Sequence, residues 1–191
     1  EQLDTLIKTY LSEQIKIAQA FPIFEVCRLV GMIKETYDRG GTIFVFGNGG
    51  GASIADHFAS DLAIHPFVSE DKHTPVIKPR LKVQCLNESG GLITRLGNDL
   101  GFDYIFVEQL RSHRLCGNDL VIAFSTSGNS PNIINAIQYA NIQGTQTVLV
   151  GGHKGGKARD LVSLCILIPG ESNFPGQVGA NNNCFHIEDF Q

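Results

Sequence analysis

The segment that decides the fold is Ile43–Ser53, which reads I-F-V-F-G-N-G-G-G-A-S. Its apolar run, Ile43–Phe46, is typical of a strand buried on both faces of a parallel sheet. The helix expected after it places Ala55, Phe58 and Leu62 on its buried face. Glycines between the two let the backbone turn tightly and approach a ligand, and the free N–H groups of a helix start favour an anion. The segment therefore predicts an α/β unit with a ligand loop.

Four more short apolar runs follow the same pattern, each ending at glycine, serine, asparagine or proline: Leu81–Leu86, Leu120–Phe124, Thr147–Val150 and Cys165–Ile168. Together they predict an α/β fold with a doubly wound, five-stranded parallel sheet flanked by helices. Two amphipathic helices, Leu3–Gln19 and Phe24–Tyr37, come first. The apolar stripe of the first helix could cover the sheet or pack against a second subunit, and the sequence leaves both open.

The chain has 191 residues, of which 42% are hydrophobic, enough for one domain with a real core. We expect a single domain over 1–191, with an N-terminal helical segment at 1–38 and an α/β core at 40–191. The proline- and glycine-containing stretches His65–Pro79 and Pro169–Cys184 are predicted to be irregular loops.

Charge and cysteine content limit the class of protein. A net charge of -4 argues against nucleic acid or an anionic membrane as the main partner. Five cysteines without a CxxC spacing predict free, mostly buried thiols in a reducing compartment. No apolar run approaches a membrane span, and the first residues do not resemble a signal peptide. These features predict a soluble, cytoplasmic protein with no nucleic acid partner and no membrane partner.

A second candidate ligand loop, Ser125–Ser130, reads S-T-S-G-N-S and follows the third predicted strand. Ser130 suits a helix N-cap and Pro131 suits the first helical turn, so a well-capped helix would explain part of the pattern. One cap needs one hydroxyl, however, and this loop has four. Because ligands bind beyond the carboxyl ends of parallel strands, the excess favours a phosphate monoester.

Two nucleotide motifs are matched only in part. Gly47–Ala52 fits the GxGxxA dinucleotide fingerprint, but the acidic residue required after a second strand would fall in the proline-broken stretch His65–Pro79. Gly151–Lys157 fits GxxxxGK, but Ala158 follows it and has no hydroxyl for magnesium. The sequence therefore predicts no nucleotide cofactor.

His57 and Asp61 are spaced i, i+4 on the helix after the glycine loop. Side chains at this spacing share one helix face and could bind one ion or one substrate. A surface helix ion pair is the alternative, and only the neighbouring glycine loop favours the first interpretation.

These loops resemble the sugar isomerase (SIS) domain family, in its phosphoheptose isomerase branch. The motifs that carry the resemblance are, in chain order, Gly47–Gly50, His57–Ala59, Gly97–Asp99 with Gly101–Phe102, Ser125–Ser130 and Gly155–Lys157. The resemblance implies a homotetramer with sites at subunit interfaces. It also implies an aldose-ketose isomerase that converts sedoheptulose 7-phosphate to D-glycero-D-manno-heptose 7-phosphate for surface polysaccharides such as lipopolysaccharide. Close relatives instead bind the replication initiator protein, so a non-catalytic sugar-phosphate-binding or protein-partner module is the alternative.

The resemblance also implies residue roles. Asp61 would be the catalytic base, and His57 with Asp61 would be metal ligands, with Zn²⁺ as the candidate ion. The substrate-binding residues it implies are Asn48, Gly49, Gly50, Asn98, Asp99, Ser125, Thr126, Ser127 and Ser130.

Three departures from the family pattern stand out. Gly51 replaces a serine and Asp61 replaces a glutamate, which shortens the proton-transfer arm. The family's final motif is best matched by Ile187–Asp189, which makes Glu188 a substrate-binding residue and a third candidate metal ligand. Its general-acid histidine then falls beyond Gln191, so we expect a fragment or a naturally shortened form. His186 is a weaker alternative for the acid.

Overall fold

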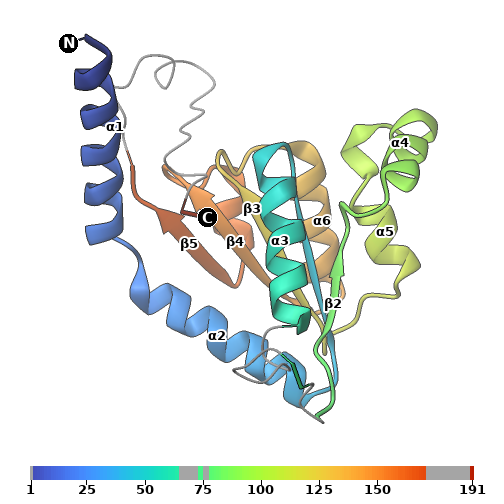
Figure 1. Cartoon of the computed structure of the whole chain (residues 1–191). Coiled ribbons are helices and arrows are strands. Elements are labelled where there is room, and N and C mark those ends of the chain that lie inside the picture. Colours follow the sequence, from blue (N-terminus) through green and yellow to red (C-terminus); the bar gives the residue numbers. More distant parts are fainter. Residues whose placement is uncertain (1, 65–72, 75–77, 171–189) are drawn as a thin grey trace.

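The computed structural model describes residues 2–64, 73–74, 78–170 and 190–191. As the sequence predicts, five parallel strands form one sheet, and their order is β2-β1-β3-β4-β5 (Figure 1). Their bounds are β1 Thr42–Gly47, β2 Lys82–Cys85, β3 Leu120–Ser125, β4 Gln146–Gly152 and β5 Leu164–Ile168. The chain leaves β1 toward β2 and then returns to β3 on the other side of β1. The carboxyl ends of β1 and β3 therefore border a topological switch point, where open α/β sheets bind ligands.

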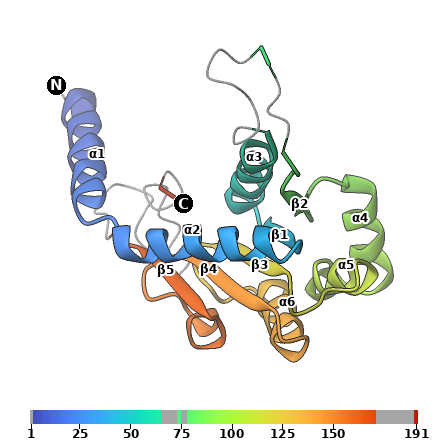
Figure 2. The same cartoon turned by 90° about the horizontal axis from the view of Figure 1, so that it is seen from below.

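Helices cover both faces of the sheet, which makes it doubly wound (Figure 2). Side chains alternate along β1: Ile43 and Val45 join the core beneath α2 (Ile23–Asp38) and α3 (Gly50–Ile64). Phe44 and Phe46 join the second core, with α5 (Val107–Ser112) and α6 (Pro131–Ile142). All six residues of β3 are buried, because the strand lies at the centre of the sheet.

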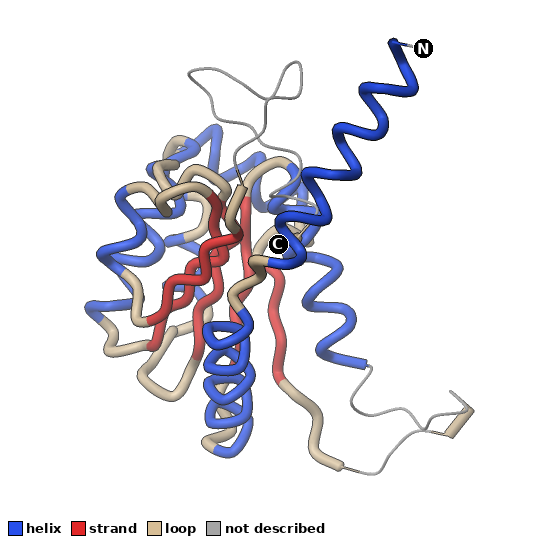
Figure 3. The backbone as a smooth tube through the Cα atoms, turned by 90° about the vertical axis from the view of Figure 1, so that its left-hand side faces the viewer, coloured by secondary structure: helices blue, strands red, loops and turns tan. Residues whose placement is uncertain are grey.

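The N-terminal helix α1 (Gln2–Gln19) projects beyond the β5 side of the sheet (Figures 1 and 3). Of its described residues only Ile17 is buried. The side chains of Leu3, Ile7, Leu11 and Ile15 are 52% to 69% exposed. Within the described part of one chain, this predicted apolar stripe does not cover the sheet.

The remaining described elements are α4 (Gly90–Asp99) and the short 3₁₀ helices η2 (Phe102–Tyr104) and η3 (Lys157–Leu161). Ser89 caps α4, since its Oγ accepts a hydrogen bond of 3.2 Å from the backbone N–H of Leu92. Most of the two predicted irregular loops, His65–Pro79 and Pro169–Cys184, lies outside the described residues.

The expectation of mostly buried cysteines is wrong for two of them. Cys27 and Cys116 are exposed free thiols, on α2 and on the turn before β3, whereas Cys85 is buried at the end of β2. Cys184 lies outside the described residues. In the part of the chain that the structure describes, no helix is both long and apolar enough to cross a membrane.

Candidate functional site

The loop after β1 packs directly on the backbone of β3. A Cβ atom added to either Gly47 or Gly51 would lie 2.8 Å from the carbonyl oxygen of Phe124. No side chain fits at that distance without a shift of backbone. Gly51 therefore serves close packing in this chain.

The next residues of the same loop are open to a ligand. Gly49 has a φ of +56°, which favours glycine, and a Cβ there would meet nothing within 4 Å. Gly49 and Gly50 are exposed, and α3 begins at Gly50 with its first N–H groups. The backbone donors that suit an anion are therefore accessible.

Two asparagines that the sequence analysis did not select hold this loop. Asn87, just after β2, donates from Nδ2 to the carbonyl of Gly47 and accepts from the Gly47 N–H, both at 3.0 Å. Asn132, in the first turn of α6, exchanges two side-chain hydrogen bonds with Asn48, at 2.8 and 2.9 Å. The only available signal was their position, since each follows the carboxyl end of a predicted strand.

The serine loop, Ser125–Ser130, presents hydroxyls at the end of β3. The Oγ atoms of Ser125 and Ser127 accept from the backbone N–H groups of Gly128 (3.2 Å) and Asn129 (3.3 Å). A hydroxyl that accepts in this way keeps its own O–H proton to donate to a ligand. Ser130 occupies the N-cap position of α6, but its side chain makes no capping hydrogen bond. Capping therefore does not account for the Ser130 hydroxyl.

The segment Gly151–Lys157 supports the serine loop. A Cβ on Gly128 would overlap the carbonyl oxygen of Gly155, and one on Gly156 would overlap that of Ser127. The backbone N–H of Lys157 donates to Asn129 Oδ1 at 3.0 Å. The GxxxxGK-like stretch thus packs against the candidate phosphate loop, which explains its glycines without a nucleotide.

One more contact reaches the serine loop from the other described end of the chain. The hydroxyl of Thr126 donates to Gln191 Oε1 at 3.4 Å, and Gln191 Nε2 donates to the carbonyl of Val150 at 3.0 Å. Sequence reasoning did not select Gln191.

The predicted pair on α3 has the expected geometry. His57 Nε2 lies 3.3 Å from Asp61 Oδ2, and the two side chains are 79% and 52% exposed. The shared helix face is thereby confirmed. In contrast to the two loops, this pair lies on an open surface of the single chain.

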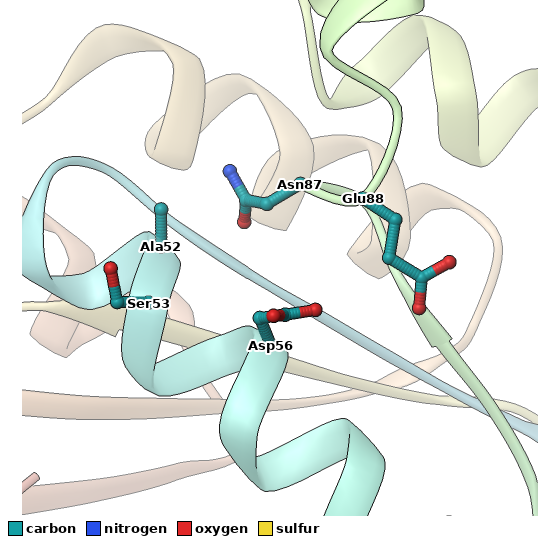
Figure 4. Close-up of a pocket in the computed structure, with 5 residues that line it drawn as sticks. All are labelled: Ala52, Ser53, Asp56, Asn87 and Glu88. Carbon is teal, nitrogen blue, oxygen red and sulfur yellow. The ribbon is translucent and has the colours of Figure 1, made fainter.

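A pocket of about 340 Å³ lies between the start of α3 and the loop after β2 (Figure 4). It is lined by Ala52, Ser53, Asp56, Asn87 and Glu88. The pKa of the neighbouring Cys85 thiol is raised, first by burial and then by the charges of Asp56 and Glu88. Sequence reasoning did not select Asp56, the carboxylate of α3 that is closest in sequence to His57.

Asn98 and Asp99 are the last two residues of α4. Asn98 Nδ2 donates to Asp99 Oδ1 at 2.9 Å, and Arg95 Nε lies 3.5 Å from Asp99 Oδ2. Among the described residues, no hydrogen bond or ion pair joins them to the glycine or serine loop. Glu188 and His186 lie outside the described residues. Within the described ranges, no cluster of three or more His, Cys, Asp or Glu side chains could hold a metal.

Parallel strands, with a glycine loop and a serine loop at the switch point, define an α/β protein whose two loops lie where open parallel sheets bind ligands. The SIS domain family model matches residues 10–152, and the chain belongs to this family.

The relatives agree with the resemblance seen in the motifs. The chain is 34% identical over 140 residues to the phosphoheptose isomerase of Citrifermentans bemidjiense, covering 73% of this chain and 68% of that protein. It is 33% identical over 168 residues to the phosphoheptose isomerase of Chlorobium limicola, covering 87% and 74%. The solved phosphoheptose isomerase of Neisseria gonorrhoeae has the same fold, with a TM-score of 0.80 at 23% identity over 98% of this chain and 91% of that one.

Proposed function

We propose that this protein is a phosphosugar isomerase that converts sedoheptulose 7-phosphate to D-glycero-D-manno-heptose 7-phosphate. The observation that carries the proposal is the pairing of two ligand loops at one switch point, in a chain whose relatives are named phosphoheptose isomerases. The activity is an aldose-ketose isomerisation, and we place it in the synthesis of surface polysaccharide heptose in the cytoplasm.

The two loops would hold the phosphorylated sugar. The hydroxyls of Ser125, Ser127 and Ser130 would donate to the phosphate oxygens, and the first N–H groups of α3 would add a partial positive charge. The Thr126 hydroxyl would also donate to the phosphate, in exchange for its hydrogen bond to Gln191. Asn48, Gly49 and Gly50 would bind the sugar from the other loop, with Asn98, Asp99 and Glu188 as further substrate contacts. This arrangement holds a phosphate without a net basic charge, which suits a chain of net charge -4.

Asp61 would carry the proton transfer between C1 and C2. Its carboxylate removes a proton from C1 while an acid partner protonates the C2 carbonyl oxygen, which gives the enediol. The proton is then returned to C2 while the C1 hydroxyl gives its own proton back to the acid partner and becomes the aldehyde carbonyl. Asp61 suits this role because its carboxylate is accessible on α3, on the face it shares with His57.

His57 and Asp61 are also a fitting pair of donors for Zn²⁺, with Glu188 as the third ligand in the proposal. The described residues supply two of these donors 3.3 Å apart. A zinc ion bound there would polarise the sugar carbonyl.

The decisive experiment is an isomerase assay of Asp61→Asn on sedoheptulose 7-phosphate, with and without added Zn²⁺. We expect kcat to fall by at least about 100-fold, because general base catalysis contributes about that much or more. The unfolding midpoint should stay the same, since the side chain is half exposed. Asp56→Asn is the matched variant. A larger loss of kcat in Asp56→Asn than in Asp61→Asn would identify Asp56, the carboxylate in the pocket, as the base. Binding of the substrate without turnover by the wild type would favour the non-catalytic module.

We further propose that residues 1–191 form one domain that assembles as a homotetramer. The support is the exposed apolar stripe of α1, because four large apolar side chains on one helix face are costly in water.

A further inference from the structure

Asn132 is the most deeply buried asparagine near the two ligand loops, with 1% of its surface exposed. A buried primary amide needs partners for its N–H groups and its oxygen, and leaving them unpaired is costly. Its partners therefore indicate what the residue does.

The backbone of α6 fixes which way the Asn132 amide points. Its Oδ1 accepts from the backbone N–H of Ile133 at 3.0 Å, one of the donors that a helix start leaves unpaired. Turning the amide over would place its NH₂ group against that N–H. The oxygen of Asn132 is thus held toward the helix backbone.

The two reciprocal hydrogen bonds between Asn132 and Asn48 fix the orientation of the Asn48 amide as well. The Asn132 oxygen accepts from Asn48 Nδ2 at 2.9 Å, and Asn132 Nδ2 donates to Asn48 Oδ1 at 2.8 Å. Asn48 can turn over only if Asn132 does, and the Ile133 N–H opposes that. The pair uses one N–H and one lone pair of Asn48, and a primary amide has a second of each. The half-buried Asn48 thus presents one N–H donor and one oxygen acceptor, each in a fixed position.

Because of the same contact, the Ser130 side chain is not needed as a helix cap. Pro131 has no N–H to satisfy, the Asn132 oxygen satisfies Ile133, and the Ser130 side chain makes no capping bond. One buried amide therefore links the glycine loop to the helix that follows the serine loop, across 84 positions of sequence.

We propose that Asn132 is a positioning residue: it fixes the amide of Asn48 so that its remaining N–H and oxygen face the sugar in one orientation. The inference rests on the proposed function, in which Asn48 contacts the substrate. Without Asn132, Asn48 can exchange donor for acceptor by a rotation about its side chain, and the sugar meets the wrong group in part of the molecules.

The test is a double-mutant cycle on wild type, Asn48→Ala, Asn132→Ala and the double variant, with sedoheptulose 7-phosphate as the probe. We expect Asn132→Ala to lower kcat/KM by about 10- to 100-fold when Asn48 is present, as misplacement of a substrate contact does. In the Asn48→Ala background the same change should cost less than about threefold. Equal losses in both backgrounds would reduce Asn132 to a structural residue and overturn the proposal.

Asn135→Ala is the matched control. Asn135 also lies on α6 and donates from its amide to a backbone carbonyl, that of Asp103 at 3.0 Å, but it does not touch the glycine loop. Its effect should be the same with and without Asn48. Thermal melting checks each variant, and Asn132→Asp, which keeps the shape and the acceptor for Ile133, replaces Asn132→Ala if the latter does not fold.

Wild-type turnover separates the two proposals. If the wild type binds the sugar phosphate without turning it over, the proposed function fails. The same cycle, read as Kd by calorimetry, still decides the role of Asn132. If Asn48→Ala changes neither turnover nor binding, Asn48 is not a substrate contact and the inference falls.

Discussion

The candidate site has two halves that are built in different ways. In the loop half, backbone packs on backbone: Gly51 against Phe124, and Gly128 against Gly155. Buried or half-buried amides then tie the loops together. In the helix half, His57 and Asp61 lie on the open face of α3, in contact with each other and largely exposed to water.

The difference suits two roles in the proposed function: the loop half anchors the substrate, and the helix half carries out the proton transfer. Loops held by close backbone contacts lose little freedom when a phosphate binds, so they can position the sugar at small entropic cost. A base on an open helix face remains solvated, and a carboxylate in bulk water gains nothing from a low-dielectric surrounding. As the proposed base, Asp61 therefore needs a cover that the described part of one chain does not supply, which suits the proposed assembly of several copies.

The strongest test of the loop half is Gly128→Ala. The residue has a φ of +62°, and its new Cβ would overlap the Gly155 carbonyl. The three nearest atoms are all backbone atoms of Gly155 and Gly156, so no flexible side chain can move aside. We expect a loss of about 3 kcal/mol or more in the free energy of unfolding, combining overpacking with backbone strain. Urea denaturation measures it.

Gly49→Ala is the matched control for backbone strain alone. Its φ of +56° is nearly the same, but a Cβ there meets nothing within 4 Å. The expected loss is about 1 kcal/mol, the cost of a left-handed conformation for an L-residue. Equal losses at the two glycines would show that the close approach of the two loops adds nothing to stability.

The sequence was sufficient for the fold because buried parallel strands have a clear signature. Each of the five apolar runs forms a strand, and the two N-terminal helices end within two residues of their predicted bounds. The strand order, β2-β1-β3-β4-β5, comes from the structure, because the run lengths and their spacing do not say on which side of β1 each later strand pairs. What α1 covers could not be predicted, since an apolar stripe indicates burial but not the partner.

The candidate site was predicted less completely. Gly49 and the serine hydroxyls could be selected because residue type alone indicates ligand chemistry. Asn87 and Asn132 could not, since their function lies in contacts to residues 40 and 84 positions away. At Ser130, sequence position alone is misleading, because the residue stands where a cap is expected and yet its side chain does not cap α6.

The proposed assembly of several copies can be tested through α1. Ile7→Glu with Leu11→Glu places two charges in the exposed apolar stripe and should shift the protein to a smaller species in sedimentation velocity. Helix content should stay the same, because both side chains are already exposed within the chain. Thr5→Glu adds a charge on the opposite side of α1 and should leave the assembly intact. An unchanged sedimentation coefficient in the double variant would show that the apolar stripe of α1 is not an interface between copies.

The smallest change in stability is expected at Ser130, in comparison with Ser89, the serine at the start of α4. Ser89 accepts from the Leu92 N–H and caps α4, so Ser89→Ala should cost about 1 kcal/mol of stability. Ser130 makes no such bond, so Ser130→Ala should change stability by less than about 0.5 kcal/mol while raising KM about tenfold, because a hydrogen bond to a charged phosphate is lost. A stability loss at Ser130 as large as that at Ser89, with KM unchanged, would mean that this hydroxyl caps α6 and does not bind the substrate.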